Sequence, residues 1–298
     1  MEKEIVLKAY AKVNLQLDVL GRRGDGYHEL AGVMQRISLY DDIAICVKEL
    51  SCSCGQDGDE RLAVAFNEPV PYNNTVRRAA ELFMGQAPFA VAINVKKSIP
   101  SEAGLGGASA DAAAVLHGLN CIFKGTDLER SIDELRSIGL SVGADVPFCL
   151  LGGCAEAKGV GELLAPLPVA KLSLLVVKGD RGVSTARLFS LLDEQGVAFA
   201  SCSHLPENAL NDMKNAIIIQ DKAAIGRLML NALQPAAERI APEIADYVMR
   251  MRESGALGAC MTGSGAAVIG LFADEAAALE AKTRFADCAF AEVCRSKG

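Results

Sequence analysis

The sequence of 298 residues contains no tryptophan, and its aromatic residues amount to only 5% of the chain. It also lacks a block of lysine or arginine, and its formal net charge is −7. A surface that binds nucleic acid needs clustered basic side chains, often with aromatic rings on which bases stack. These absences argue against a nucleic-acid partner.

Long apolar runs and histidines are also scarce. No stretch reaches the roughly 18 uninterrupted apolar residues of a membrane span, and the first residues alternate charged and apolar side chains without a signal-peptide core. We therefore expect a soluble, cytoplasmic protein with no membrane partner. Three histidines are too few for a rich metal site, so the sequence leaves any metal ligands unknown.

Ten cysteines are present, but their placement predicts neither a disulfide framework nor a zinc site. Cys52 and Cys54 form a Cys-x-Cys pair with no second pair at zinc-site spacing, and their role stays open. Six others lie among Ala, Val, Leu and Phe and are expected to act as small buried hydrophobes: Cys121, Cys149, Cys154, Cys260, Cys288 and Cys294. Reduced thiols in a cytosolic protein are the favoured interpretation.

Half of the chain is hydrophobic (51%), enough for one large domain or two ordinary ones. Residues 12–19 alternate polar and apolar side chains, which predicts a strand with one apolar face. Further strands are predicted at 43–47, 90–95, 148–151, 172–178 and 266–272. Helices are predicted at 76–84, 109–123, 128–138, 185–192, 222–233, 242–254 and 274–285, with Asn74 or Thr75 capping the first and Ser109 the second. This mixture, without regular βαβ alternation, indicates an α+β fold, and residues 159–168 are the best candidate for a domain boundary.

The most informative motif is the glycine-rich loop of residues 100–110, Pro-Ser-Glu-Ala-Gly-Leu-Gly-Gly-Ala-Ser-Ala. Glycine tolerates positive φ, so the loop can point several N–H groups into one cavity. The helix that follows adds its positive end and unpaired N–H groups, and together they predict a phosphate site. No Gly-Lys-Ser/Thr follows, as a Walker A loop requires. A dinucleotide fingerprint would place its third glycine where Ser109 stands. A tight turn packed against a neighbour is the structural alternative.

Two charged residues can accompany such a site. Asp145 stands between a glycine turn and an apolar run, where it can accept a proton from an attacking hydroxyl; an Asx-turn is the common alternative. Lys12, on the polar face of the first strand, can pair with Asp145 or offset charge on a transferring phosphoryl group. A solvated lysine is its ordinary interpretation.

Two further segments can meet a ligand. Residues 261–267, Met-Thr-Gly-Ser-Gly-Ala-Ala, offer hydroxyls and a second close backbone approach, or else a simple glycine turn. Tyr27 and His28 follow a glycine turn, and this pair can stack on or hydrogen-bond a planar ring.

Taken together, these segments resemble the GHMP kinase superfamily. The loop at 100–110 is similar to its second motif, and residues 261–267 are similar to its third. Three stretches are closer to the members that act in the non-mevalonate route to isoprenoids: Ala11-Lys-Val-Asn-Leu15, Gly21-Arg-Arg-Gly-Asp-Gly-Tyr-His-Glu-Leu30 and Gly143-Ala-Asp-Val-Pro-Phe148. The similarity covers nearly the whole chain.

The resemblance implies a two-domain fold with the active site in the cleft between the domains, residues 1–160 being the ATP-binding domain and residues 161–298 the substrate-side domain. It implies ATP and Mg²⁺ as cofactors, and a small-molecule substrate that is a cytidine diphosphate ester of methylerythritol. The γ-phosphoryl of ATP would move to the 2-hydroxyl of that substrate. Lys12 and Asp145 are the implied catalytic pair.

The other implied roles are those of binding residues. Asn74 and Lys96 would border the adenine of ATP, and the rest of the ATP site is the loop Pro100, Ser101, Glu102, Ala103, Gly104, Leu105, Gly106, Gly107, Ala108, Ser109 and Ala110. The substrate would meet Asn14, Tyr27, His28, Gly263 and Ser264. Ala108 and Ala110 depart from the glycine and serine common in relatives, so Ser109 is the remaining candidate for a hydroxyl contact to Mg²⁺.

Three other functions compete with this interpretation. A GHMP kinase for homoserine or mevalonate would share the glycine loop but has no reason to keep the Tyr27–His28 pair. A nucleotide-binding dehydrogenase would need a complete dinucleotide fingerprint. A non-catalytic nucleotide-binding protein would not need both Lys12 and Asp145. The oligomeric state is not indicated by the sequence.

Overall fold

The computed structural model describes residues 2–50, 61–194 and 208–298. The chain forms two compact units that interleave along the sequence. Unit 1 takes the described parts of Met1–Ala11, Leu39–Ile99 and Gly107–Leu151, and unit 2 takes those of Lys12–Ser38, Pro100–Gly106 and Gly152–Gly298. The units therefore do not follow the single boundary predicted near residue 160, because the long strands β1 (Glu2–Arg22) and β2 (His28–Glu49) contribute to both. The division of nucleotide and substrate between residues 1–160 and 161–298 stays a prediction.

Unit 1 contains a sheet in which β4 (Phe89–Lys96) lies between β2 and β3 (Leu62–Phe66). β4 runs antiparallel to β2, with Asp42 opposite Lys96, and parallel to β3. Alternate residues of β4 are buried, among them Val91, Ile93 and Val95. This period of two gives the sheet one apolar face.

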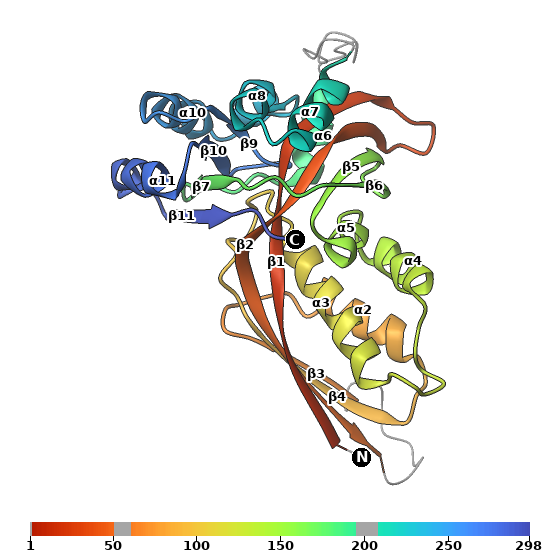
Figure 1. The fold of residues 1–298 in the computed structure, drawn as a ribbon. Coiled ribbons are helices and arrows are strands. Elements are labelled where there is room, and N and C mark those ends of the chain that lie inside the picture. The colour runs from red at the N-terminus through yellow and green to blue at the C-terminus, as the bar shows by residue number, and fades with distance from the viewer. Residues whose placement is uncertain (1, 51–60, 195–207) are drawn as a thin grey trace. The chain divides into compact units, whose positions relative to one another are not determined.

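In the part of unit 1 that the structure describes, the labelled helices are α2 (Thr75–Met84), α3 (Gly107–Ile122), α4 (Ile132–Val142) and the short α5 (Val146–Leu151). α2 and α3 lie on one side of the sheet (Figure 1), and their apolar residues join those of β2 and β4 in one core. α3 is rich in alanine, so that α2 and α5 both pack closely against it.

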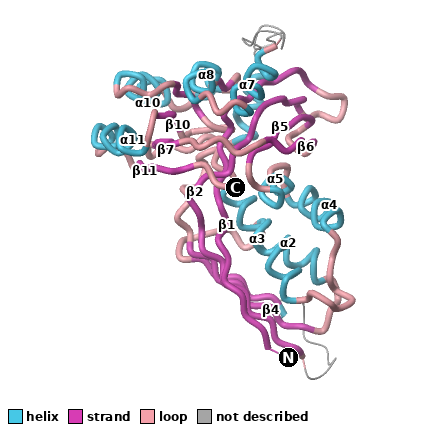
Figure 2. Tube along the Cα trace, viewed as in Figure 1, coloured by secondary structure: helices cyan, strands magenta, loops and turns pink. Residues whose placement is uncertain are grey.

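Unit 2 contains β5 (Cys154–Gly159), β6 (Leu163–Leu167) and β8 (Leu230–Asn231), which extend β2 and β1. It also holds a separate antiparallel sheet in the order β11 (Phe290–Arg295), β7 (Ser173–Lys178), β10 (Val268–Phe272) and β9 (Gly258–Met261). Figure 2 shows α10 (Glu243–Glu253) and α11 (Glu275–Lys282) together on one side of this sheet. The second core of the molecule lies between them.

The other helices among the described residues of unit 2 are α6 (Thr185–Glu194), α7 (Ala209–Ile218), α8 (Lys222–Leu228) and α9 (Gln234–Ala237), with a 3-10 turn at Thr283–Phe285. Helices and mainly antiparallel strands are thus mixed in both units, as the α+β prediction required. The sheets are not the doubly wound parallel sheet of a dinucleotide-binding dehydrogenase.

Several sequence-based elements differ from the structure. Residues 148–151 are not a strand but part of α5, a short apolar run whose Pro147 fits a first helical turn. The helix predicted at 128–138 begins only at Ile132, because Ser131 is its N-cap and forms a capping box with Glu134. The helix predicted at 222–233 ends at Leu228, because Leu230 and Asn231 pair with β1. Strands β3, β5, β6, β9 and β11 and helices α7 and α9 were not predicted.

The described cysteines are free thiols of differing exposure. Cys154, Cys260 and Cys294 are buried, as predicted, and burial raises the pKa of Cys154 and of Cys260 to about 12. Cys149 and Cys288 are only half-buried. Cys121 is exposed, so the prediction was wrong there, because its position on α3 faces away from the core. Cys52 and Cys54 lie outside the described residues. Among the residues that the structure describes, no helix has the length and apolar character to span a membrane.

Candidate active site

The glycine-rich loop Pro100–Gly106 is held in place within unit 2 by hydrogen bonds to its carbonyl groups. The carbonyl oxygens of Glu102 and Ala103 accept hydrogen bonds from the N–H groups of Ala266 (3.1 Å) and Ala267 (3.2 Å). The loop is curled, with positive φ at Glu102 (49°), Gly104 (70°) and Gly106 (68°). A loop anchored by its carbonyls and curled in this way is suited to present N–H groups to an anion.

The two glycine loops predicted from the sequence lie against each other in unit 2. A Cβ atom added at Gly104 would overlap the carbonyl oxygen of Thr262, and one added at Gly263 would lie 2.6 Å from the carbonyl oxygen of Gly104. Glycine is therefore required at 104 for close approach as well as for φ. The 261–267 loop is braced by Asn231, whose amide donates to the carbonyls of Met261 (2.9 Å) and Gly263 (2.7 Å).

Lys12 is part of the same cluster. Its backbone N–H donates to the carbonyl of Leu105 (2.9 Å), and its side chain lies over Gly106, where an added Cβ would be 2.9 Å from the lysine Cγ. The Nζ atom donates to Oδ1 of Asn14 (2.8 Å), whose own N–H donates to Oγ1 of Thr262 (2.8 Å). Lys12 and Asn14 are only 4% and 3% exposed. Lys12 is therefore not an ordinary solvated strand lysine.

Asp145 lies in unit 1, in the turn between α4 and α5. It is half-buried, and its carbonyl accepts the N–H of Cys149 (3.0 Å). A Cβ added at Gly143, two residues earlier, would lie 3.5 Å from Oγ of Ser109. The turn that carries Asp145 thus lies beside the first turn of α3.

Helix α3 begins at Gly107, so Ser109 belongs to its first turn and is not the cap that the sequence predicted. The N–H groups of this turn have no partner within the helix and carry its positive end. Thr75, at the start of α2, donates from Oγ1 to the carbonyl of Ala108 (2.7 Å). The starts of both helices therefore meet at this turn.

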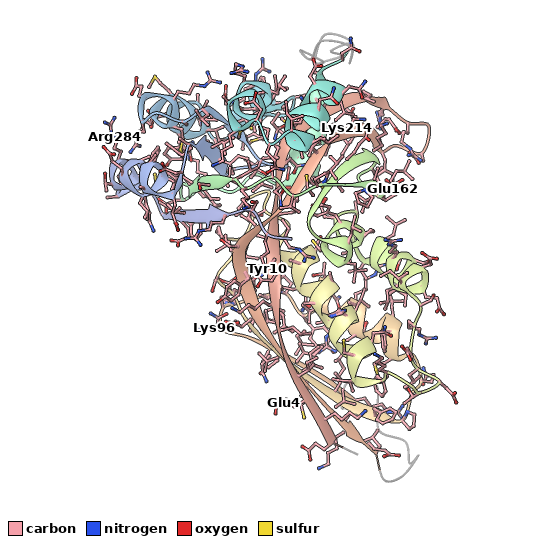
Figure 3. All side chains as sticks on the ribbon, viewed as in Figure 1. Glu4, Tyr10, Lys96, Glu162, Lys214 and Arg284 are labelled. Atoms are coloured by element: carbon pink, nitrogen blue, oxygen red, sulfur yellow. The ribbon has the colours of Figure 1, made fainter. Side chains whose placement is uncertain are left out.

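The two predicted adenine-side residues have different surroundings. Asn74 caps α2: its Oδ1 accepts the N–H of Arg77 (3.0 Å), and its amide donates to the carbonyls of Pro71 and Tyr72. Lys96 is the exposed last residue of β4, and Figure 3 shows it on the side of the sheet away from α2 and α3. A nucleotide role for either residue stays a prediction.

Two of the predicted substrate residues, His28 and Ser264, contact helix α6. His28 is 7% exposed, stacks on Phe189 with ring centroids 4.6 Å apart, and bonds through Nε2 to Oδ1 of Asp193 (3.0 Å). Ser264 shares a hydroxyl hydrogen bond of 2.7 Å with Thr185. These three partners on α6 carry no sequence signal beyond the helical pattern.

Tyr27 differs from its neighbour His28. It is 64% exposed, and its N–H donates to Oδ1 of Asp25 (3.1 Å) within the turn that precedes β2. Its ring is therefore open to a planar ligand, whereas the ring of His28 is already held by protein groups.

Sequence reasoning missed a buried ionic cluster in unit 1. Nζ of Lys97 lies 2.5 Å from Oδ2 of Asp41 and 2.6 Å from Oδ2 of Asp111. Burial raises the pKa of Asp111 to about 7; Lys97 opposes this shift, and the charge of Asp41 adds to it. Burial alone would lower the pKa of Lys97, but the two carboxylates raise it above its ordinary value. Lys97 continues the buried alternation of Val91, Ile93 and Val95, a pattern that could have identified it.

Comparison with known proteins agrees with this geometry. Residues 74–153 match the model of the GHMP kinases N terminal domain, and residues 213–290 match that of the GHMP kinases C terminal. The chain is therefore a GHMP kinase by fold and by sequence.

Similar proteins of known name indicate one family within the GHMP kinases. A 4-diphosphocytidyl-2-C-methyl-D-erythritol kinase of Desulfitobacterium hafniense is 41% identical over 92% of this chain and 89% of its own, and one of Syntrophomonas wolfei is 39% identical over 96% and 95%. The crystal structure of a 4-(cytidine 5'-diphospho)-2C-methyl-D-erythritol kinase matches with a TM-score of 0.78 at 32% identity, covering 99% of this chain and 100% of that one. The chain belongs to the 4-diphosphocytidyl-2-C-methyl-D-erythritol kinase family.

A homoserine kinase from Cytophaga hutchinsonii resembles it in fold alone, with a TM-score of 0.74 at 19% identity, covering 99% of this chain and 94% of that one.

Proposed function

We propose that this protein transfers the γ-phosphoryl group of ATP to the 2-hydroxyl of 4-diphosphocytidyl-2-C-methyl-D-erythritol, a step of non-mevalonate isoprenoid biosynthesis. Family membership supports the kinase chemistry. The observation that carries the residue-level proposal is the burial of Lys12 over Gly106, with its ammonium bonded to Asn14. A buried cation beside an anion-binding loop is suited to stabilise charge on a transferring phosphoryl group.

The nucleotide phosphates would bind the N–H groups of residues 104–109. Two features support this assignment: the positive φ of Gly104 and Gly106, and the N–H groups at the start of α3, which have no partner within the helix. Mg²⁺ bound with the nucleotide would neutralise part of the charge of its phosphates. The hydroxyl of Ser109, in the first turn of α3, would be the candidate protein oxygen to help hold it.

Asp145 would accept the proton of the 2-hydroxyl as its oxygen attacks the γ-phosphorus. The new oxygen–phosphorus bond forms while the bond from the γ-phosphorus to the β,γ-bridging oxygen breaks, and ADP leaves. Lys12 would act as the charge partner of Asp145 and offset charge at the attacking oxygen. The proposal therefore requires both groups at the substrate hydroxyl in the complex with nucleotide, which a crystal structure with an ATP analogue and a cytidine nucleotide would test.

The substrate would be recognised by its cytosine and diphosphate. Tyr27, exposed and next to the held ring of His28, is suited to stack on the base. The backbone of Gly263 and the hydroxyl of Ser264 would meet the diphosphate, and Asn14 would help to position the sugar alcohol.

An assay of ATP turnover with three acceptors tests the function. The cytidylyl alcohol should be phosphorylated, whereas homoserine and mevalonate should not, and NAD should show no binding in a titration. Efficient phosphorylation of either small acceptor without the cytidylyl group would refute the proposal and favour another GHMP kinase. Turnover of none of them would favour a non-catalytic nucleotide-binding protein.

A further inference from the structure

The ionic cluster of Asp41, Lys97 and Asp111 joins three separate segments of unit 1. Asp41 comes from β2, Lys97 follows β4, and Asp111 lies on α3. Their side chains are 0%, 8% and 2% exposed. None of the three is assigned a part in the proposed chemistry above.

The cluster holds the segment that enters the glycine loop. Oδ1 of Asp41 accepts hydrogen bonds from the N–H groups of Ser98 and Ile99, the latter at 2.8 Å. Its other oxygen binds Lys97. One carboxylate thus fixes three consecutive residues immediately before Pro100.

The same cluster holds the helix that leaves the loop. Lys97 donates to Asp111, one turn into α3. A Cβ added at Gly107, the first residue of that helix, would lie 3.1 Å from Cγ2 of Ile99 and 3.4 Å from Nζ of Lys97. The chain leaves unit 1 at Ile99 and returns to it at Gly107, and these two residues therefore lie close together. Beside them, the ammonium of Lys97 joins the carboxylates of Asp41 and Asp111.

Stability alone is a poor reason for such a cluster. Two carboxylates share one ammonium in a buried place, and within the described residues Oδ1 of Asp111 is buried without a hydrogen-bond partner. Desolvation of buried ions often outweighs their attraction, and an unmade bond adds to the cost. What the cluster does provide is a fixed separation and direction for both ends of the loop.

We propose that Asp41, Lys97 and Asp111 are positioning residues for the nucleotide, holding both ends of the glycine loop so that its N–H groups converge on the ATP phosphates. This inference rests on the proposed function, and it concerns the nucleotide side of the site alone. Binding of the cytidylyl substrate should not depend on the cluster.

Steady-state kinetics and calorimetric titration with a non-hydrolysable ATP analogue test this. Asp111→Asn keeps the shape of the side chain and leaves Lys97 paired with Asp41; Lys97→Met removes the shared ammonium. Loss of charged hydrogen bonds should raise KM for ATP and Kd for the analogue by about 10-fold in the first variant and roughly 100-fold in the second. KM for the cytidylyl substrate should stay within about twofold, since it is bound elsewhere.

Exposed residues of the same unit supply matched controls. Asp133→Asn on α4 and Lys48→Met on β2 make the same chemical changes at the surface and should leave both KM values unchanged. A purely structural cluster would lower the melting temperature or kcat without a selective change in ATP affinity, and that result in Asp111→Asn would overturn the inference. If Lys97→Met does not fold, Asp111→Asn decides.

The same experiments distinguish a failure of the proposed function from a failure of the inference about the ionic cluster. A wild-type protein that binds the ATP analogue but does not phosphorylate the cytidylyl alcohol would refute the function, while the analogue titration would still decide on the cluster.

Discussion

A carboxylate that takes a proton only during phosphoryl transfer contributes to turnover and not to nucleotide binding. Asp145→Asn should therefore lower kcat by a factor on the order of 10² to 10⁴, the usual range for loss of a general base. Kd for an ATP analogue should change little. Single-turnover kinetics and calorimetry measure the two quantities, with the exposed Asp133→Asn as control. Near-normal turnover would remove Asp145 from this role.

The raised pKa of Asp111 makes the free energy of unfolding depend on pH. The pKa of Asp111 is about 7 in the folded protein, compared with an ordinary value of 3.8. Between these two pH values the folded protein keeps a proton on the carboxyl group, whereas the unfolded chain has released it. The stability contributed by this carboxyl is thus present at acid pH and lost as pH rises through 7. The free energy of unfolding of wild type minus that of Asp111→Asn should fall from about pH 5 to about pH 8. Urea denaturation at both values measures it; a difference that grows with pH would show that the pair with Lys97 dominates instead.

The neighbours Lys96 and Lys97 show what local pattern can and cannot predict about residues. Successive residues of an extended chain point to opposite faces, so Lys96 is exposed, whereas the side chain of Lys97, directly after β4, is only 8% exposed. Lys96, not Lys97, was predicted as a site residue. The segments of Lys12 and Asp145 were found because each lies in a recognisable local motif. Asp41 was not, because its partners Lys97 and Asp111 are distant in sequence and only the fold brings them together.

At the level of elements, the contact between the two glycine loops has a direct consequence. Gly104→Ala meets both a strained φ and the carbonyl of Thr262, whereas Gly125→Ala meets a similar φ of 78° with open space around it. Both variants should lose about 1 kcal/mol from the backbone strain, but only Gly104→Ala should displace the loop. Thermal unfolding and analogue titration compare them. Equal ATP affinity in the two variants would contradict a role for this loop contact.

Element type followed from the sequence where the period was clear, as in α2, α10 and β4, or where a run of small helix-forming residues indicated a helix, as in α3. Boundaries were less predictable. The Ser131–Glu134 capping box is a local signal that marks the start of α4, and it could have been used. By contrast, the end of α8 at Leu228 depends on pairing of Leu230 with Gln16, and α5 is too short for its period to distinguish helix from strand. These outcomes depend on tertiary partners.

At the level of the whole molecule, the interleaving of the two units could not be predicted from the sequence. Composition changes mark boundaries where few contacts cross, but β1 and β2 run through both units without a break in pattern. The family and the α+β class were predictable because the motifs that carry them are local.

Thermal unfolding of the whole protein measures the binding of each of the two proposed ligands separately. A ligand that binds only the folded protein adds about 2.7 kcal/mol at 100 times its Kd, a rise of roughly 5 °C in Tm for a chain of this size. An ATP analogue and cytidine diphosphate should each produce such a shift in wild type. Tyr27 is 64% exposed, so Tyr27→Ala should leave the Tm of the free protein nearly unchanged while abolishing most of the cytidine shift and preserving the ATP-analogue shift. Loss of both shifts would indicate a general folding defect, and an undiminished cytidine shift would show that Tyr27 does not contact the base.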